Sequence, residues 1–168
     1  MLKWIGCILL IAAGAGTGYL QSHKLTARVR FLEAFLQFLT WLETQIRYSA
    51  SELEALLAGY EAPLTLQPLL TECAGRMGQD EPFSQAWDQG VALLPKESGL
   101  LPGDRQLLCQ FAEGLGSTDV QGQIAHCAMQ RAFFTNRLEE ARDERQKKGK
   151  LYTMLGSFAG VGVSLLFL

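Results

Sequence analysis

The chain has 168 residues, of which 48% are hydrophobic and 19% are charged, and its formal net charge is −2. This length fits a single domain, and the apolar content excludes a disordered chain, which would be richer in charge. Fifteen Lys and Arg residues face 17 Asp and Glu residues. A nucleic-acid-binding protein would carry a basic excess, so that class of protein is also disfavoured.

Two uncharged, apolar runs lie near the ends of the chain, at residues 4–20 and 151–168. As helices they would be about 26 and 27 Å long at roughly 1.5 Å per residue. That length is at the short end of what crosses a bilayer core about 30 Å thick. We therefore predict transmembrane helices at 1–20 and 151–168, with a cytoplasmic helical-bundle domain at 21–150.

Glycines at helical spacing occur in both runs, as the pairs Gly14 and Gly18, and Gly156 and Gly160. Small residues four positions apart let membrane helices approach closely, so these four are candidate packing positions. Glycine is also frequent in membrane helices without such a role, and that alternative stays open.

Basic residues predict the orientation of the two spans. Eight of them flank the central segment, whereas Lys3 lies on the other side of the first run. Because basic residues near the ends of spans stay in the cytoplasm, we expect both termini outside. The first run, with Ala13, Gly14 and Ala15, also resembles a secretory signal with a cleavage site, but the flanking charges argue against export. The eight residues are Lys24, Arg28, Arg30, Arg142, Arg145, Lys147, Lys148 and Lys150.

The central segment begins with a long helix, expected from about Lys24 to Tyr48 as a continuation of the first span. Apolar residues recur along it at steps of three and four, which is typical of a buried helix face. A second apolar face indicates that the helix is sandwiched between partners. The first face comprises Leu32, Phe35, Leu39, Leu42 and Ile46, and the second comprises Phe31, Phe38 and Trp41.

Three shorter helices are predicted next, at 51–60, 64–77 and 82–94. Ser51 and Glu54 have the spacing of a capping box at the start of the first. Pro68 either kinks the second or marks its true first turn.

The stretch 94–104 is the richest in Gly and Pro, and it predicts the most exposed loop of the domain. Asp104 is expected to cap a helix that ends at Glu113, and Thr118 or Asp119 is expected to cap the last helix. No strand pattern is found, so the predicted fold class is all-α: a helical bundle flanked by transmembrane helices.

The last helix carries apolar residues alternately four and three apart, which is the pattern of a heptad seam. Arg131 interrupts the seam, and it either extends to the solvent edge or pairs with a carboxylate. The seam consists of Val120, Ile124, Cys127, Arg131, Phe134, Leu138 and Ala141.

The sequence holds only two histidines and almost no arrangement of residues that could carry catalysis. His126 stands next to Cys127, but adjacent residues of a helix point about 100° apart and cannot form a nucleophile–base pair. The sequence shows no metal-ligand spacing and no phosphate-binding glycine loop. We therefore expect no enzyme and no catalytic, cofactor-binding or metal-binding residues.

Charge is distributed unevenly. Residues 48–119 hold 11 acidic and 3 basic side chains, whereas residues 131–150 hold 7 basic and 4 acidic ones. The basic end suits anionic lipid headgroups. The acidic part either binds a basic partner or merely keeps the domain soluble. Asp80, Glu81 and Asp88, together with Arg131, are the candidate partner-binding residues.

Several segments are familiar in their order: IRYSASELEAL, then LGSTDVQGQ, then the basic KKGKLY leading into the final run. With them the whole chain resembles the stage III sporulation protein AB family of endospore-forming bacteria. That family in turn resembles a single copy of the F domain of type II secretion and type IV pilus platform proteins. Such platforms usually carry two F domains, so their stoichiometry does not transfer directly.

The resemblance implies a non-enzymatic membrane platform in the sporulation channel between mother cell and forespore. The expected site is the outer forespore membrane, with the helical domain in the mother-cell cytoplasm. The expected partners are the sporulation ATPase (the stage III AA protein), other membrane components of the same operon and the lipid bilayer. No nucleic acid is expected. An alternative is a membrane-anchored signalling module, a homo-oligomer that dimerises through the seam at 120–141.

Overall fold

The computed structural model describes the backbone of residues 2–48, 52–116 and 118–166, and the side chains of residues 20–48, 52–116 and 118–148. Within these ranges the chain forms α-helices and one 3-10 helix and no strand, which confirms the predicted all-α class. The elements are α1 (Leu2–Tyr48), α2 (Leu53–Gly59), α3 (Gln67–Met77), α4 (Phe83–Leu93), η1 (Lys96–Ser98), α5 (Pro102–Gly114) and α6 (Val120–Leu166).

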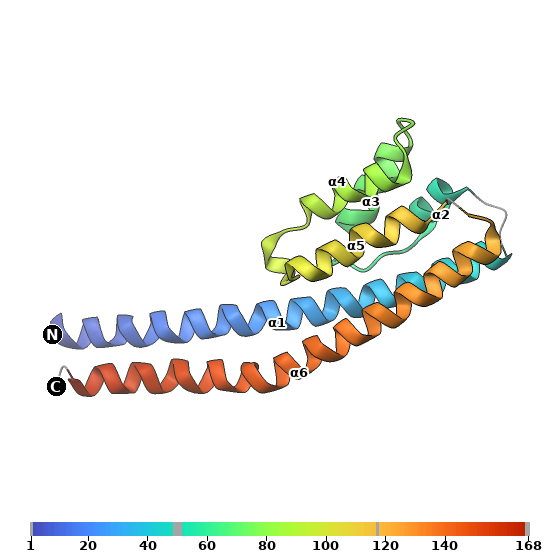
Figure 1. Ribbon diagram of the computed structural model, residues 1–168. Coiled ribbons are helices and arrows are strands. Elements are labelled where there is room, and N and C mark those ends of the chain that lie inside the picture. The colour runs from blue at the N-terminus through green and yellow to red at the C-terminus, as the bar shows by residue number, and fades with distance from the viewer. Residues whose placement is uncertain (1, 49–51, 117, 167–168) are drawn as a thin grey trace.

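The two long helices, α1 and α6, define the shape of the molecule (Figure 1). Each is 47 residues long, and they run side by side in opposite directions, so both ends of the chain lie at the same end of the pair. The shorter helices α2–α5 cover one side of this pair, away from the chain ends. The first helix is therefore continuous from the apolar run into the bundle, as predicted.

Among the described residues, no helix is long and apolar enough to cross a bilayer. The side chains of the two predicted spans, 4–20 and 151–168, lie outside the described residues except for Leu20. The candidate packing glycines Gly14, Gly18, Gly156 and Gly160 lie outside them as well.

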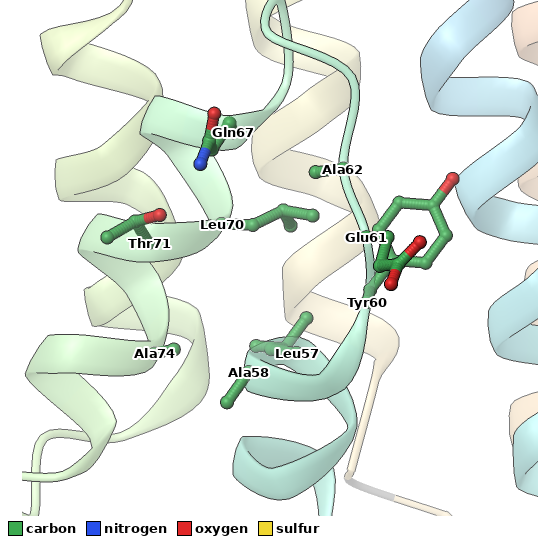
Figure 2. Close-up of a pocket in the computed structure, with 9 residues that line it drawn as sticks. All are labelled: Leu57, Ala58, Tyr60, Glu61, Ala62, Gln67, Leu70, Thr71 and Ala74. Atoms are coloured by element: carbon green, nitrogen blue, oxygen red, sulfur yellow. The ribbon is translucent and has the colours of Figure 1, made fainter.

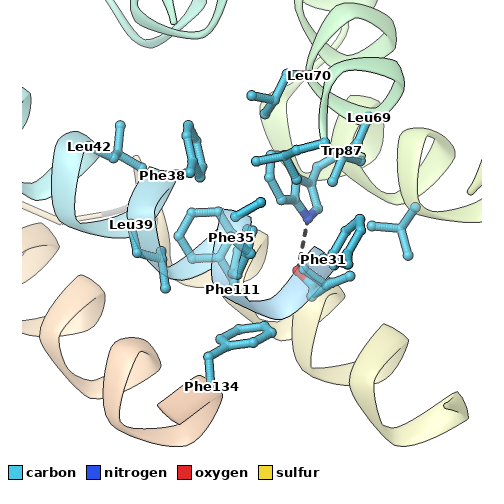
Figure 3. Close-up of a cluster of buried hydrophobic side chains, with 14 of the residues drawn as sticks. Phe31, Phe35, Phe38, Leu39, Leu42, Leu69, Leu70, Trp87, Phe111 and Phe134 are labelled. Carbon is cyan, nitrogen blue, oxygen red and sulfur yellow. Dashed lines mark hydrogen bonds between the residues drawn. The ribbon is translucent and has the colours of Figure 1, made fainter. Parts of the chain in front are cut away.

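An aromatic cluster forms the core between the long pair and the shorter helices (Figure 3). Phe35 of α1 lies at its centre, with ring centroids 4.4 Å from Phe134 of α6, 5.5 Å from Phe111 of α5 and 6.1 Å from Trp87 of α4. The indole Nε1 of Trp87 donates a hydrogen bond of 2.9 Å to the carbonyl of Leu108. Most members of the two predicted apolar faces of α1 are buried, namely Phe31, Leu32, Phe35, Phe38, Leu39 and Leu42. Trp41 and Ile46 are partly buried and pack against this core.

The heptad seam of α6 packs against α1 of the same chain. Cys127, Phe134, Leu138 and Ala141 are buried, and Phe134 has no exposed surface. The seam prediction is therefore right about burial for these four residues, whereas Ile124 is only half-buried and Val120 is 49% exposed, and the partner of the seam is intramolecular. Arg131 takes the paired alternative, because its Nη1 lies 3.1 Å from Glu43 Oε2 on α1.

The first residues of α3, α6 and α2 can be compared with the predicted helix starts. Pro68 lies in the first turn of α3, so it starts that helix and does not kink it. Asp119 caps α6, with its Oδ1 accepting a hydrogen bond of 2.9 Å from the amide of Gly122. The residue preceding α2 is Glu52, which makes no capping hydrogen bond with its side chain. Ser51 lies outside the described residues, so the predicted capping box is not tested.

The stretch 94–104 is the predicted exposed loop only in part, because the segment around Gly99 packs against α1. Its exposed residues are Pro95, Lys96, Glu97, Leu101 and Pro102. Gly99 has a φ of 71°, and a Cβ added there would lie 2.9 Å from the carbonyl carbon of Lys24 and closer still to its oxygen. Arg105 holds the start of the stretch, donating to the carbonyls of Val91 at 2.8 Å and Leu94 at 2.9 Å. The Gly and Pro residues here mark a chain reversal, and the backbone of this reversal packs closely against α1.

A buried ion pair closes the end of this stretch. Arg28, which is 2% exposed, donates through Nε and Nη2 to both carboxylate oxygens of Asp104, at 2.7 and 3.0 Å. Its Nη1 donates to Glu144 of α6 at 3.0 Å, and Asp104 also accepts from the amide of Leu101 at 2.9 Å. Asp104 therefore lies in the first turn of α5, with Leu101 at the cap position, which corrects the prediction that Asp104 itself is the cap.

Arg28 thus belongs to the core and not to the solvent-exposed basic flank to which the sequence assigned it. Burial alone lowers the pKa of its guanidinium, but the hydrogen bonds and charge of Asp104, with the charges of Glu144 and Glu140, outweigh burial and raise the pKa. The side chain joins α1, α5 and α6 at one point.

We expect Gly99→Ala to lower the free energy of unfolding by roughly 2–5 kcal/mol, since the left-handed backbone costs about 1–2 kcal/mol and overpacking against Lys24 about 1–3 kcal/mol. Gly116 is the matched control, because its φ is 79° and a Cβ there would meet nothing within 4 Å. Gly116→Ala should show the backbone cost alone in denaturant titrations followed by tryptophan fluorescence. Equal losses in the two variants would contradict the close approach to α1.

Arg28→Met should destabilise the fold by about 3–5 kcal/mol, because it leaves the Asp104 carboxylate buried without its cation. Adding Asp104→Asn should restore part of the loss. Arg142, whose ion pair with Glu33 is solvent-exposed, is the control, and Arg142→Met should cost about 0–1 kcal/mol. A loss for Arg28→Met no larger than for Arg142→Met would disprove the buried pair as a structural anchor.

Candidate functional site

An acidic surface lies at the turn between α3 and α4, at the point of the molecule that projects away from the long helix pair (Figure 1). We call it the acidic tip and define it as Glu54, Glu72, Asp80 and Glu81. Arg76 lies among these carboxylates, with Nε 2.7 Å from Glu72 Oε1 and Nη1 3.3 Å from Glu81 Oε2. Four carboxylates and one guanidinium give the tip a formal charge of −3.

The backbone of this turn directs Asp80 outward. Asp80 has a φ of 63°, which places it in the left-handed region that Asp enters more readily than most residues. The amide of Asp80 donates to Met77 at 3.0 Å, and the amide of Gly78 donates to Ala74 at 3.0 Å. Asp80 is exposed. The turn is thus held by its own backbone and leaves this carboxylate available to a partner.

The structure brings only two of the four predicted partner-binding residues together. Asp80 and Glu81 share the tip, whereas Asp88 lies further along α4, beside Cys109 of α5. Arg131 lies in the other layer, on α6, where Glu43 neutralises it. A single docking surface built from all four is therefore not what the fold presents.

Two members of the acidic tip were missed by the sequence analysis. Glu72 could have been found from its i,i+4 spacing to Arg76 on one helix. Glu54 could not have been found from the sequence, because it belongs to α2. Only the packing of α2 against α3 brings its carboxylate to the turn, where Oε1 lies 3.3 Å from the position that a Cβ on Gly78 would occupy. The tip is thus a tertiary feature.

A groove lies next to the tip, between α2, the following segment and α3 (Figure 2). Its volume is about 520 Å³. Glu61 is the one charged side chain among the residues that line it, and the other members are small, apolar or amide and hydroxyl side chains. The lining residues are Leu57, Ala58, Tyr60, Glu61, Ala62, Gln67, Leu70, Thr71 and Ala74.

The side chains of His126 and Cys127 are engaged in packing. His126 Nε2 lies 2.9 Å from the carbonyl oxygen of Phe111, and its ring stacks on the Phe111 ring with centroids 6.1 Å apart. Cys127 has no exposed surface, and burial, followed by the charge of Glu43, raises its pKa to about 11. Among the described residues, no three His, Cys, Asp or Glu side chains gather where they could hold a metal ion.

The family model described as stage III sporulation protein AB matches residues 3–168. The chain belongs to the stage III sporulation protein AB family. A relative of that name from Bacillus subtilis (strain 168) is 26% identical over 172 residues, covering all of both chains. No solved structure matches the chain. Membership of the family gives the protein a role in sporulation.

Two further thiols of this family member, those of Cys73 and Cys109, are protonated as well. Burial, followed by the charge of Glu81, raises the pKa of Cys73 to about 12. Burial, followed by the hydrogen bond and charge of Asp88, raises the pKa of Cys109 to about 11. Because the thiolate is the reactive form, none of the three is activated at neutral pH.

We expect Cys73 and Cys127, both fully buried, to resist a thiol reagent in the folded chain at pH 8 and to react in denaturant. Half-buried Cys109 should react first. The measurement is the labelling rate of each residue in a Cys7→Ser background, read by peptide mass spectrometry between pH 7 and 10. Labelling of Cys127 in the folded chain as fast as in denaturant would contradict its burial.

Proposed function

We propose that this protein is a non-enzymatic membrane platform component of the sporulation channel between mother cell and forespore. It is anchored in the outer forespore membrane by residues 4–20 and 151–168, with both termini outside and residues 21–150 in the mother-cell cytoplasm. The acidic tip binds the cytoplasmic sporulation ATPase, and the long helix pair lies among the other membrane components of the complex.

The observation that carries this proposal is the opposite placement of the chain ends and the acidic tip. The pairing of α1 with α6 puts both apolar runs at one end of the molecule, as a membrane hairpin requires (Figure 1). The acidic tip lies away from that end. The part of α1 beyond residue 20 is about 42 Å long at 1.5 Å per residue. This length is enough to carry the docking surface clear of the headgroup layer.

Charge supports the same orientation. The described residues near the chain ends include the exposed cations Lys24, Arg30, Arg145 and Lys147. Such residues stay on the cytoplasmic side of a span and are attracted to anionic headgroups. The acidic tip lies much further from the headgroups than a Debye length of about 8 Å, so it remains available to a basic partner surface.

In this proposal the helical domain is a single domain of the F type, related to those of type II secretion platforms. In this proposal the platform holds the ATPase in position and performs no chemistry of its own. The protonated thiols and the engagement of His126 with the Phe111 carbonyl support that view.

The signalling alternative required dimerisation through the seam of α6. Phe134, where a crosslink between two copies would report it, is fully buried against α1 of the same chain. The seam is therefore already occupied, and we do not carry this alternative further.

Charge reversal of the tip tests the proposal. We expect Asp80→Lys with Glu81→Lys to reduce capture of the sporulation ATPase by the full-length protein at least tenfold, since like charges then face a basic partner. The matched control is Glu139→Lys with Glu140→Lys, two exposed acids of α6, which should leave capture within twofold.

The measurement is copurification from sporulating cells, with unfolding midpoints to show that both variants are folded. Unchanged capture by the tip variant would exclude the tip as the docking surface. Equal loss in both variants would show a dependence on net charge alone. Asp88→Lys separately tests the predicted acidic residue that the fold places elsewhere.

A further inference from the structure

We propose that a basic pocket between α1, η1 and α6 binds the phosphate headgroup of an anionic phospholipid. The proposal rests on the membrane anchoring proposed above, because that anchoring places the pocket at the bilayer surface. The exposed cations described above attract anionic headgroups diffusely, and the pocket adds a specific site for one lipid.

The pocket has a volume of about 350 Å³. Three lysines from three different elements converge on it: Lys24 of α1, Lys96 of η1 and Lys148 of α6. Arg28 and Glu144 also line it, so the ion-pair cluster of the fold forms one of its walls. Its other lining residues are Gln21, Leu25, Gly99, Leu100 and Leu101, and the three leucines add apolar surface suited to a glycerol backbone.

The charges in and behind the pocket do not cancel. Arg28 is balanced by the Asp104 carboxylate behind it, and Lys148 pairs with Glu144. Lys24 and Lys96 remain in excess, which leaves a formal charge of +2 for the cluster. A phosphodiester carries one negative charge and accepts charge-assisted hydrogen bonds from ammonium groups.

The pocket lies at the same level relative to the bilayer as a phospholipid headgroup. Lys24 lies four residues beyond the end of the first apolar run and Lys148 three residues before the second, which corresponds to about 6 and 4.5 Å along the helices at 1.5 Å per residue. The polar layer on each face of a bilayer is about 5–7 Å thick. A lipid phosphate therefore lies at the level of these ammonium groups.

The three lysines are exposed, but the wall on which they converge is a formed structure. Gly99 presses η1 against the backbone of α1, and the amide of Leu101 is held by the same Asp104 carboxylate that binds Arg28. Lys96 is thereby held opposite α1 and α6, because Arg105 fixes the preceding carbonyls of Leu94 and Pro95. A headgroup in the pocket would bridge the two membrane-proximal helices and η1.

The test uses the full-length chain in vesicles of dioleoylphosphatidylcholine, with and without dioleoylphosphatidylglycerol. A ligand that binds only the folded state raises its stability, so phosphatidylglycerol should raise the unfolding midpoint. The variant Lys24→Gln, Lys96→Gln and Lys148→Gln should lose this increase. The matched control is Arg30→Gln, Arg145→Gln and Lys147→Gln, which removes three exposed cations at the same end but outside the pocket lining, and it should keep the increase.

Each other outcome overturns the proposal in a distinct way. Equal loss in the two triple variants would show diffuse attraction to the membrane surface and no site. Stabilisation by inorganic phosphate or glycerol phosphate as large as that by the lipid would show a site for soluble anions. A chain that associates with no vesicles would contradict the membrane anchoring itself, whereas one that associates with both kinds equally, without stabilisation, would contradict only the pocket.

Discussion

The guanidinium of Arg28 links three parts of the chain, namely α1, α5 and α6. It lies in a buried environment and reaches Asp104 at the start of α5 and Glu144 on α6, so the positions of both elements on α1 are set together. A buried charge is tolerated only when its partners are in place. The register of the long pair and the packing of the stretch before α5 therefore depend on one another, and Gly99 and Arg105 complete the same junction from the other side.

The fold places its two kinds of surface at opposite ends because of this junction. The cations and the basic pocket lie where α1 and α6 meet η1, on the side of the molecule that faces the chain ends, and the acidic tip lies at the far end of the shorter helices (Figure 1). The aromatic core around Phe35 joins the two, since it contacts α4, α5 and α6 at once. A force on the acidic tip is therefore transmitted to the long pair through packed side chains. In the described part of the chain, no flexible linker separates the tip from the long pair.

Local pattern was enough to predict the helices and their buried faces, because helical periodicity directly encodes which side chains leave water. It was not enough for the stretch 94–104, where Gly and Pro signal a reversal of the chain but not whether the reversal packs. Arg28 and Asp104 are 76 residues apart, so no local signal links them, and Arg28 looks like an ordinary basic flank. The candidate site was recovered only in part for the same reason: Asp80 and Glu81 are neighbours in sequence, whereas Glu54 reaches the tip through tertiary packing.

The pairing of α1 with α6 joins the two ends of the chain, and this has a consequence for biosynthesis. Glu33 and Arg142, which form an ion pair across the two helices, are 109 residues apart. At a translation rate of about 5–20 residues per second, α1 therefore waits roughly 5–20 s for its partner. During that interval the phenylalanine-rich face of α1 has no α6 to cover it. The nascent chain thus requires early packing of α4 and α5 on that face, or a chaperone, to avoid aggregation while the ribosome completes the second long helix.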